Sequence, residues 1–262
     1  MSDTVLLERA GGVATITLNR PDSMNSLSIE MKEALIAALA QVREDDTVRA
    51  VVLTGAGQAF CVGQDLREHA ALLAAGDPGP LNTVREHYNP IALGLVDMPK
   101  PVVAAVNGMA AGAGASMAFA CDFRVAAEHA AFLMAFARVG LSADTGASWT
   151  LPRLVGHARA TALMMLAEPV TPAQALEMGL ITAAVPDDRV LAAGHELASR
   201  LAAGPTMAYA AIKEAIRYGG SATLADALER EAQLQERCGA TDDHRNATAA
   251  FVAKQQAGFE GR

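Results

Sequence analysis

Two glycine-containing segments in the first half of the chain have the composition of backbone sites for a negatively charged oxygen. Residues 60–66 (FCVGQDL) follow a short β-rich run, and residues 107–115 (NGMAAGAGA) follow a continuous apolar strand. Each leads into an expected helix, whose first N–H groups have no partner inside the helix and attract negative charge. Taken singly, the first is better explained as a turn capped by Asp65, and the second as a close helix–helix contact. Together they are more specific, because two amides from separate turns can converge on one oxygen as an oxyanion hole.

Asp144 is the acidic residue best placed to take part in such chemistry. It lies in a segment of small residues, 139–148 (VGLSADTGAS), just before an apolar stretch that is expected to be helical. A carboxylate could act there as an acid or a base. An aspartate before a helix also commonly caps the first N–H groups, and the residues alone favour the cap.

Other chemistries find little support in the sequence. Gly112-x-Gly114 lacks the third glycine of a dinucleotide-binding turn, because Met117 occupies that position. The six histidines form no cluster and the three cysteines have no metal-ligand spacing, so no metal site is expected. Ser116 has no G-x-S-x-G setting, which argues against a serine hydrolase.

Composition bounds the partners and the compartment. Of the 262 residues 52% are hydrophobic, which is enough for a sizeable core, and the net charge of −8 argues against nucleic acid as a partner. No uninterrupted apolar run is long enough to cross a membrane, and the first residues lack the basic-then-apolar pattern of a signal peptide. With three cysteines and no disulfide framework, we expect a cytoplasmic protein without membrane association.

The elements that must position these residues form an α/β pattern. Alternation and short apolar runs predict strands at 13–18, 50–54, 101–106, 123–126 and 131–133. Helical spacing and end signals predict helices at 28–45, up to about 96 with a bend near Pro90, through 120 after the turn at 108–114, and from Thr171 to Gly179. Residues 76–80 are expected to be a mobile loop. From 188 onward the pattern is almost entirely helical, so an α/β core over 1–195 is expected to precede a helical region over 196–262.

Three motifs give the chain a resemblance to a known family. Residues 19–27 (NRPDSMNSL), 60–66 (FCVGQDL) and 106–115 (VNGMAAGAGA) resemble, in order and spacing, the enoyl-CoA hydratase/isomerase (crotonase) superfamily. The resemblance runs from about Thr15 to Phe259. It implies a crotonase (ClpP-like) spiral of ββα units with a C-terminal helical region for trimerisation. It also implies an acyl-CoA substrate, no cofactor other than the coenzyme A of that substrate, and a homotrimer or hexamer.

The same resemblance assigns residues to the site. The backbone N–H groups of Gln64 and Ala113 would form the oxyanion hole, with Ala113 in place of the commoner glycine. The CoA path would be lined by Met24, Val62, Asp65 and Leu66. Arg67 and Lys254 would contact CoA phosphates, Lys254 from a neighbouring subunit. The alternative for both cations is a solvated surface charge.

The positions that vary within the superfamily decide the reaction. Hydratases of the family use two glutamates, and the corresponding positions here hold Ser116 and Phe136, which become candidates for the acyl pocket. Hydration needs one group to activate water and another to deliver a proton, so these two side chains disfavour it. Asp144 matches the catalytic aspartate of a subgroup that resembles ring-1,2-epoxyphenylacetyl-CoA isomerases of phenylacetate catabolism and Δ3,Δ2-enoyl-CoA isomerases. The segment LSADTGASW replaces the more usual LIPDCGGTW, which leaves the substrate open.

The expected activity is therefore isomerisation through an enolate, with Asp144 as the single acid/base. Three alternatives stay open. The first is an enoyl-CoA hydratase. The second is a 4-chlorobenzoyl-CoA dehalogenase-like enzyme, since ADTGAS resembles that family's NDTATS; its histidine and tryptophan positions hold Asn89 or a neighbour and Phe136. The third is a crotonase-fold CoA binder without catalysis.

Overall fold

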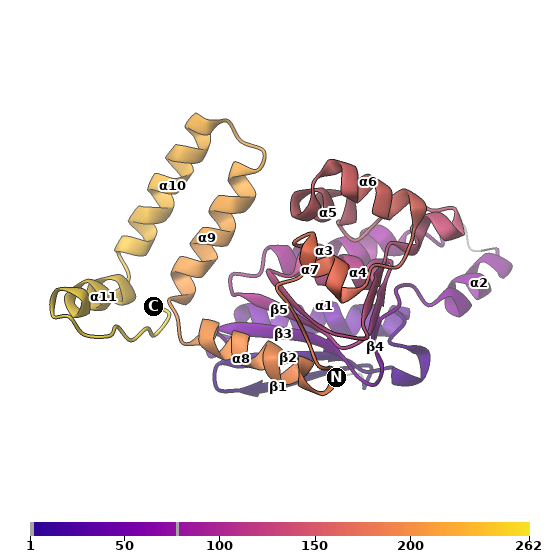
Figure 1. The fold of residues 1–262 in the computed structure, drawn as a ribbon, viewed down its shortest axis with the longest axis horizontal. Helices are drawn as coiled ribbons and strands as arrows, with labels where there is room; N and C mark the ends of the chain where they lie inside the picture. The colour runs from indigo at the N-terminus through magenta and orange to yellow at the C-terminus, as the bar shows by residue number, and fades with distance from the viewer. Residues whose placement is uncertain (1–2, 77–78) are drawn as a thin grey trace.

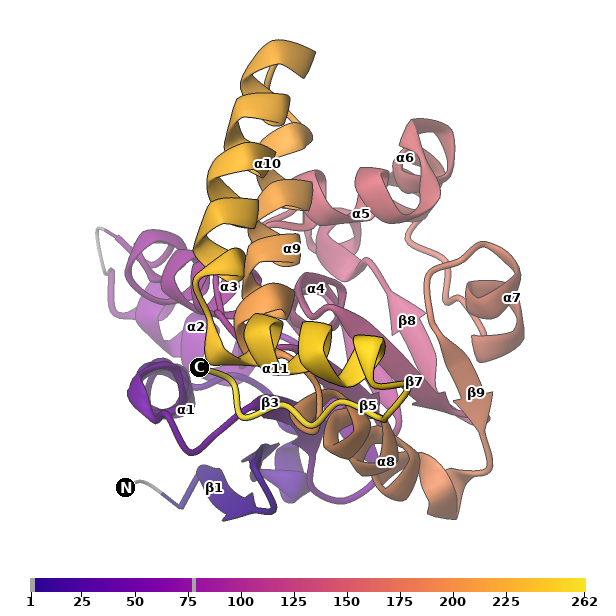
Figure 2. The same cartoon turned by 90° about the vertical axis from the view of Figure 1, so that its left-hand side faces the viewer.

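The computed structural model of the chain describes residues 3–76 and 79–262. Figure 1 shows an α/β body with a helical hairpin extending from one end, and Figure 2 shows the same arrangement from the side. The loop predicted at 76–80 includes residues 77–78, which lie outside the described residues. None of the helices in the described ranges has the length and apolar character needed to span a membrane.

A six-stranded sheet forms the centre of the body. Its order is β1 (Val5–Ala10), β2 (Val13–Leu18), β3 (Ala50–Gly55), β5 (Val102–Val106), β7 (Phe123–Ala127) and β9 (Ala183–Val185). The β1–β2 pair is antiparallel and all other neighbours are parallel. The predictions of β2, β3, β5 and β7 are confirmed. The sequence analysis missed β1, which is an edge strand with five exposed or half-exposed residues in a row, and β9, which is only three residues long.

A smaller parallel sheet lies beside it and consists of β4 (Ala59–Cys61), β6 (Met109–Ala111) and β8 (Ala131–Leu133). Each strand follows a strand of the large sheet and precedes a helix: α2 (Leu66–Ala74), α4 (Ala113–Ala120) or the short 3₁₀ helix η3 (Ala135–Val139). This repeated ββα order is the spiral expected from the resemblance. The short runs of β4 and β6 were not predicted as strands.

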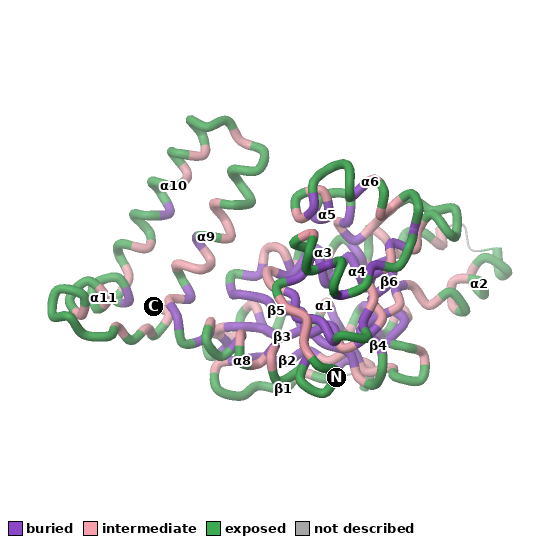
Figure 3. The backbone as a smooth tube through the Cα atoms, in the orientation of Figure 1, coloured by how far each residue is buried: buried purple, intermediate pink, exposed green. Residues whose placement is uncertain are grey.

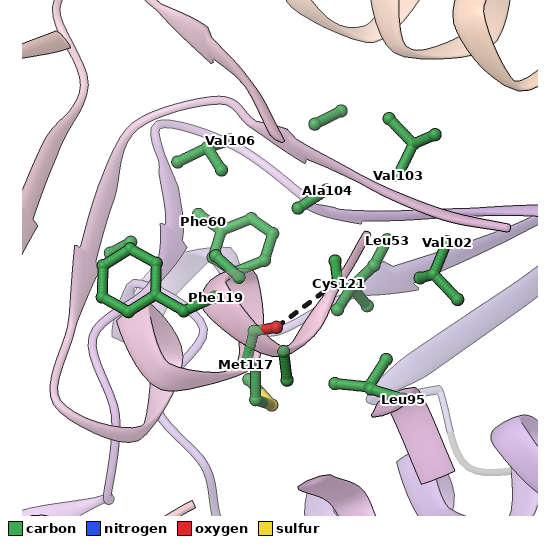
Figure 4. Packing of buried hydrophobic residues seen from close by; sticks show 14 of the residues in the cluster. Leu53, Phe60, Leu95, Val102, Val103, Ala104, Val106, Met117, Phe119 and Cys121 are labelled. Carbon is green, nitrogen blue, oxygen red and sulfur yellow. Dashed lines mark hydrogen bonds between the residues drawn. The ribbon is translucent and has the colours of Figure 1, made fainter. Parts of the chain in front are cut away.

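Helices cover the large sheet and complete its core. On one side lie α1 (Ile29–Glu44) and α3 (Asn89–Val96), and α8 (Val190–Ala202) packs against β3, β5 and β7. Ser28 caps α1 by accepting the N–H of Met31 at 3.2 Å. Figure 4 shows the core around β5, where Val102, Ala104 and Val106 lie among side chains from β3, β4, α3 and α4.

The body contains further helices, and the sequence predicted the start of one of them, α7 (Pro172–Glu177), from its end signals. The others are η1 (Pro21–Ser23), the π-helical η2 (Val84–Tyr88), α5 (Ala147–Val155), α6 (His157–Leu166) and η4 (Asp187–Arg189). Thr171 and Gln174 form a capping box at the start of α7, as Thr171-Pro172 predicted. The predicted bend near Pro90 corresponds to the π-helical turn of η2, which passes directly into α3.

The C-terminal region consists of α9 (Thr206–Gly219), α10 (Leu224–Gly239) and α11 (Asp242–Val252). The predicted boundary at 195/196 falls within α8, which packs on the sheet, so the helices that leave the body begin with α9. The chain after α11 returns to the body, where Arg49 Nη1 donates a hydrogen bond to the carbonyl of Phe259 at 2.8 Å.

Candidate active site

The pairing of β4 with β6 brings the two glycine-containing turns together. These strands are parallel, with Cys61 opposite Ala110, so their carboxyl ends lie at the same edge of the small sheet. A Cβ atom on Gly63 would lie 2.9 Å from the carbonyl oxygen of Ala111 and 3.3 Å from the amide nitrogen of Ala113. The first turn therefore lies in direct contact with the start of the second helix.

The amide groups of Gln64 and Ala113 are oriented by their neighbours. Leu27 pairs with the backbone on both sides of Gln64, donating to Gly63 O at 2.7 Å and accepting from Asp65 N at 3.2 Å. Because successive residues of extended backbone face opposite ways, the N–H of Gln64 points away from Leu27. Ala113 is the first residue of α4, so its N–H has no acceptor one turn earlier in the helix.

Both turns line one cavity at this edge of the small sheet. Its wall also includes residues that follow β8, so all three strands of the sheet contribute to it. The lining residues are Val62, Gly63, Gln64, Leu66, His69, Leu81, Thr83, Val84, Tyr88, Gly112, Ala113, Ala135, Phe136, Val139, Leu141 and Asp144. Most of these side chains are apolar, and among the described residues lining the cavity Asp144 has the one carboxyl group.

Asp144 is held at the cavity wall and does not cap α5. The residue preceding α5 is Gly146, without a side-chain cap, so the N-cap alternative for Asp144 is wrong. The hydroxyl of Thr145 donates to Asp144 Oδ1 at 2.7 Å. Burial raises the pKa of Asp144 from its ordinary value, although the Thr145 hydrogen bond and the charge of Lys32 oppose this shift.

A polar cluster behind Gln64 was missed by the sequence analysis. Lys32 on α1 is fully buried, and its ammonium donates to Thr83 Oγ1 at 2.6 Å and to Gln64 Oε1 at 3.4 Å. The hydroxyl of Tyr88 donates to the same Gln64 oxygen, and burial raises the pKa of Tyr88. The sequence did contain a signal for Lys32. It follows Met31 and precedes Leu35 by three residues, which places it on the apolar side of a predicted amphipathic helix.

The residues predicted for the CoA path lie around the cavity mouth with different surroundings. Val62 and Leu66 line the cavity, and Met24 is exposed next to them, its carbonyl accepting the N–H of Val62 at 3.2 Å. Asp65 caps α2 and pairs with Arg20 at 3.0 Å, so its carboxylate already has protein partners. Arg67 is exposed in the first turn of α2.

Two predicted site residues do not join this group within the chain. Lys254 follows α11, which lies at the opposite end of the molecule from α2 (Figure 1). Ser116 was a candidate for the acyl pocket, but it is fully buried and its hydroxyl donates to the carbonyl of Gly112 at 2.9 Å. Its side chain therefore turns back onto its own helix and lies outside the cavity wall, whereas Phe136 is part of that wall.

Other reactive groups near the site have structural surroundings. Burial raises the pKa of the Cys61 thiol to about 12, so it is not a thiolate nucleophile. In the described ranges, no group of three or more His, Cys, Asp or Glu side chains is placed to hold a metal ion. Among the described residues, the cavity thus brings together the turns that carry the Gln64 and Ala113 amides, one carboxyl group and mostly apolar walls.

Comparison with known proteins agrees with this arrangement. The model of the family described as enoyl-CoA hydratase/isomerase matches residues 8–262. The chain is 41% identical to the 1,2-epoxyphenylacetyl-CoA isomerase of Escherichia coli over the full length of both, and 45% identical to a Rhodobacter capsulatus protein named "Probable enoyl-CoA hydratase" over 99% of this chain and 98% of that one. A solved structure from Mycobacterium abscessus, provisionally named an enoyl-CoA hydratase/isomerase, superposes with a TM-score of 0.94 at 43% identity, covering 98% of this chain and all of the other.

Proposed function

We propose that this chain, which belongs to the enoyl-CoA hydratase/isomerase family, is an acyl-CoA isomerase that moves one proton with Asp144. The observation that carries the proposal is that Asp144 is the one carboxyl group among the described residues lining the cavity. Ser116 and Phe136 stand where a hydratase of the family has its two glutamates. Neither can activate a water molecule, and a single base that takes and returns one proton suits isomerisation.

The proposed reaction passes through an enolate. The N–H groups of Gln64 and Ala113 bind the thioester oxygen and stabilise the negative charge that develops on it. Asp144 removes a proton from the α- or γ-carbon of the acyl group, and the electron pair delocalises onto the thioester oxygen. The same carboxyl group then returns the proton at the other carbon, so that the double bond moves and nothing is added or lost.

The walls of the cavity support an apolar acyl group. Leu81, Val84, Phe136, Val139 and Leu141 surround the space in front of the two amides. Such walls bind hydrocarbon or ring substrates by removing their apolar surface from water. We therefore propose a 3-enoyl-CoA as the substrate of this proton transfer. A ring epoxide of phenylacetyl-CoA, whose isomerisation rearranges bonds of the ring and does not shift one double bond, is a second candidate because of the similarity to the Escherichia coli isomerase.

A hydratase is the second candidate, because the Rhodobacter capsulatus relative bears that name. It would require a second acid/base group beside Asp144. Among the described lining residues the other titratable side chains are His69 and Tyr88, and neither stands at a position where the family's hydratases have a glutamate. A dehalogenase-like reaction would use Asp144 as a nucleophile and needs a histidine and a tryptophan beside it. The matching positions hold Asn89 or a neighbour and Phe136, so this reaction has less support, although His69 also lines the cavity.

The test of the proposal is the substitution Asp144→Asn. We expect turnover of the preferred enoyl-CoA ester to fall by about 100-fold to 10,000-fold, because the acid/base is lost while the shape is kept. Binding of acyl-CoA esters, followed by the rise in melting temperature, should change little, because the two amides remain. Asp187→Asn, on an exposed aspartate paired with His129, is the control and should leave turnover unchanged. Wild-type turnover in Asp144→Asn would refute the proposal.

A further inference from the structure

We propose that Lys32 is a positioning residue of this site, whose buried ammonium holds Gln64 in place and puts a positive charge behind the wall of the cavity that contains Asp144. The inference rests on the proposed function, in which Gln64 binds the thioester oxygen and Asp144 moves the proton.

The first step is that Lys32 occupies a position where a lysine is costly. Lys32 is 0% exposed and lies on the side of α1 that also carries Met31, Leu35 and Leu39. Burial of a cation costs free energy unless polar or charged groups compensate for the lost water, and burial lowers the pKa of Lys32. Among the described residues no carboxylate oxygen lies within the 4.0 Å that defines an ion pair with its Nζ. Its charge is therefore not neutralised by a direct partner.

The second step is that the contacts of Lys32 lead to the proposed oxygen-binding turn. Its ammonium donates to Gln64 Oε1 at 3.4 Å and to Thr83 Oγ1 at 2.6 Å, and it lies 5.2 Å from the centroid of the Tyr88 ring. Gln64 Oε1 also accepts the hydroxyl of Tyr88. Two donors thus fix the side chain of Gln64, which lines the cavity. Thr83 Oγ1 lies 3.1 Å from His87 Nδ1, which extends the cluster along η2.

A second buried lysine, which lies just before β5 and reaches the C-terminal end of α1, shows what a purely structural role looks like. Lys100 is 6% exposed and donates to the carbonyls of Val42, Arg43 and Asp45 at 2.6, 3.1 and 2.7 Å. It thereby satisfies unpaired carbonyls at the C-terminal end of α1. Lys32, near the other end of α1, bonds to side chains of the cavity wall. Lys100 is therefore a matched control for the loss of a buried ammonium.

The third step concerns the charges around Asp144. The titratable groups near this part of the cavity are Lys32 from α1, Asp65, Glu68 and His69 from the segment around α2, His87 and Tyr88 from η2, and Cys61 from β4. Lys32 bonds to Gln64 and Thr83, which line the same cavity as Asp144, and its charge, after the Thr145 hydrogen bond, lowers the pKa of Asp144 against the effect of burial. Removal of its charge should therefore raise the pKa of Asp144 further, so that less of the carboxylate is ionised at neutral pH.

The experiment compares Lys32→Met, Lys32→Arg and Lys100→Met with the wild type. For Lys32→Met we expect kcat to fall by about tenfold or more with a smaller change in KM, and the acid limb of the kcat profile to move to higher pH. Lys32→Arg keeps the charge and should keep the position of the acid limb, even if the larger side chain lowers stability. Lys100→Met should lower stability without moving the acid limb.

A second readout does not depend on turnover. The infrared carboxyl band of Asp144, isolated by subtracting the Asp144→Asn spectrum, can be titrated in the protein without substrate. Its midpoint should lie at higher pH in Lys32→Met than in the wild type, and near the wild-type value in Lys100→Met and Lys32→Arg. If no enoyl-CoA ester is turned over by the wild type but this midpoint moves, the proposed function fails while the effect of Lys32 on Asp144 stands. An unmoved midpoint in folded Lys32→Met, or an equal shift in Lys100→Met, overturns the inference.

Discussion

At the scale of single residues, Asp144 shows how a residue type in the sequence can leave open where its side chain lies. An aspartate before a helix is ordinarily a cap, and nothing in segment 139–148 contradicts that interpretation. The ambiguity is removed by the backbone, because Gly146 precedes α5 and Asp144 lies two residues earlier, on the cavity wall. Such a placement depends on the path of the chain between η3 and α5, which residue types alone do not specify.

Replacement of Asp144 by asparagine should change the free energy of unfolding in a pH-dependent way, because burial raises the pKa of Asp144. The folded protein binds the Asp144 proton more tightly than the unfolded chain does. The stability contributed by this group is therefore complete below the unfolded pKa and is lost as pH rises through the folded pKa. Asp144→Asn has no such loss, so its stability relative to the wild type should increase as pH rises from acid to neutral. Urea unfolding of both proteins between acid and neutral pH measures this difference in stability.

Asp187 should show the opposite pH dependence of stability in the same unfolding experiment. Hydrogen bonds from His129 lower the pKa of this exposed carboxyl group, so Asp187→Asn should lose stability relative to the wild type as pH rises. A constant difference between Asp144→Asn and the wild type at every pH would contradict the account of Asp144 as a buried, desolvated carboxyl group.

At the scale of elements, the sequence predicted the large sheet better than the small one that builds the site. Buried parallel strands such as β3 and β5 are continuous apolar runs, which are readily recognised. Strands β4 and β6 have three residues each, too few to show a period, yet their pairing makes the two turns meet. The meeting of the two turns was expected from the resemblance to the enoyl-CoA hydratase/isomerase superfamily, because strands this short leave no local sequence pattern.

Helices α4 and α1 explain the two remaining differences between prediction and structure. All eight residues of α4 are buried, so its sequence does not indicate which side faces the cavity, and Ser116 was assigned to the wrong one. In α1 the apolar face was predicted correctly, but Lys32 within it was not singled out. Its partners come from η2 and from the turn before α2, far along the chain.

The close contact between the two turns predicts a strict requirement for glycine in α4. A Cβ atom on Gly114 would lie 2.1 Å from the carbonyl oxygen of Cys61, which is backbone and can move only with the first turn. We expect Gly114→Ala to lower the free energy of unfolding by about 1–3 kcal/mol and to reduce turnover by displacing the amides. Denaturant unfolding and a turnover assay measure both effects.

Gly239→Ala, at the end of α10 where the added methyl group would meet no atom within 4 Å, is the matched control. It should leave turnover unchanged and stabilise the fold by at most ~1 kcal/mol. Retention of full stability and activity in Gly114→Ala would show that the two turns are not in tight contact.

At the scale of the whole molecule, the C-terminal helices are unlike the body. Figure 3 shows exposed or half-exposed residues along most of α9, α10 and α11, whereas the central strands are buried. Ile216, Leu224 and Phe251 are 73%, 76% and 84% exposed. We propose that other copies of the chain cover these side chains in a homotrimer or hexamer. Measurement of the mass of the protein in solution tests this proposal. Such an assembly could also bring Lys254 to the cavity of a neighbour.

Charge at this scale bears on how an acyl-CoA would be held. The chain has a net charge of −8, and the phosphates of CoA are negative, so attraction must come from a few local cations. Arg67 beside the cavity mouth is the candidate within the chain, and Lys254 is the candidate from a second copy. In this account the overall charge opposes binding, and the apolar cavity with its two amides provides most of the specificity.

The central claim is that this molecule shifts a double bond with one carboxyl group and adds no water. It is tested most directly by incubating 3-enoyl-CoA and 2-enoyl-CoA esters with the enzyme in water labelled with heavy oxygen, and by weighing the products in a mass spectrometer. The account predicts interconversion of the two esters with unchanged mass and no heavy oxygen in either. Formation of a labelled hydroxyacyl-CoA at a rate equal to or greater than the double-bond shift would contradict it.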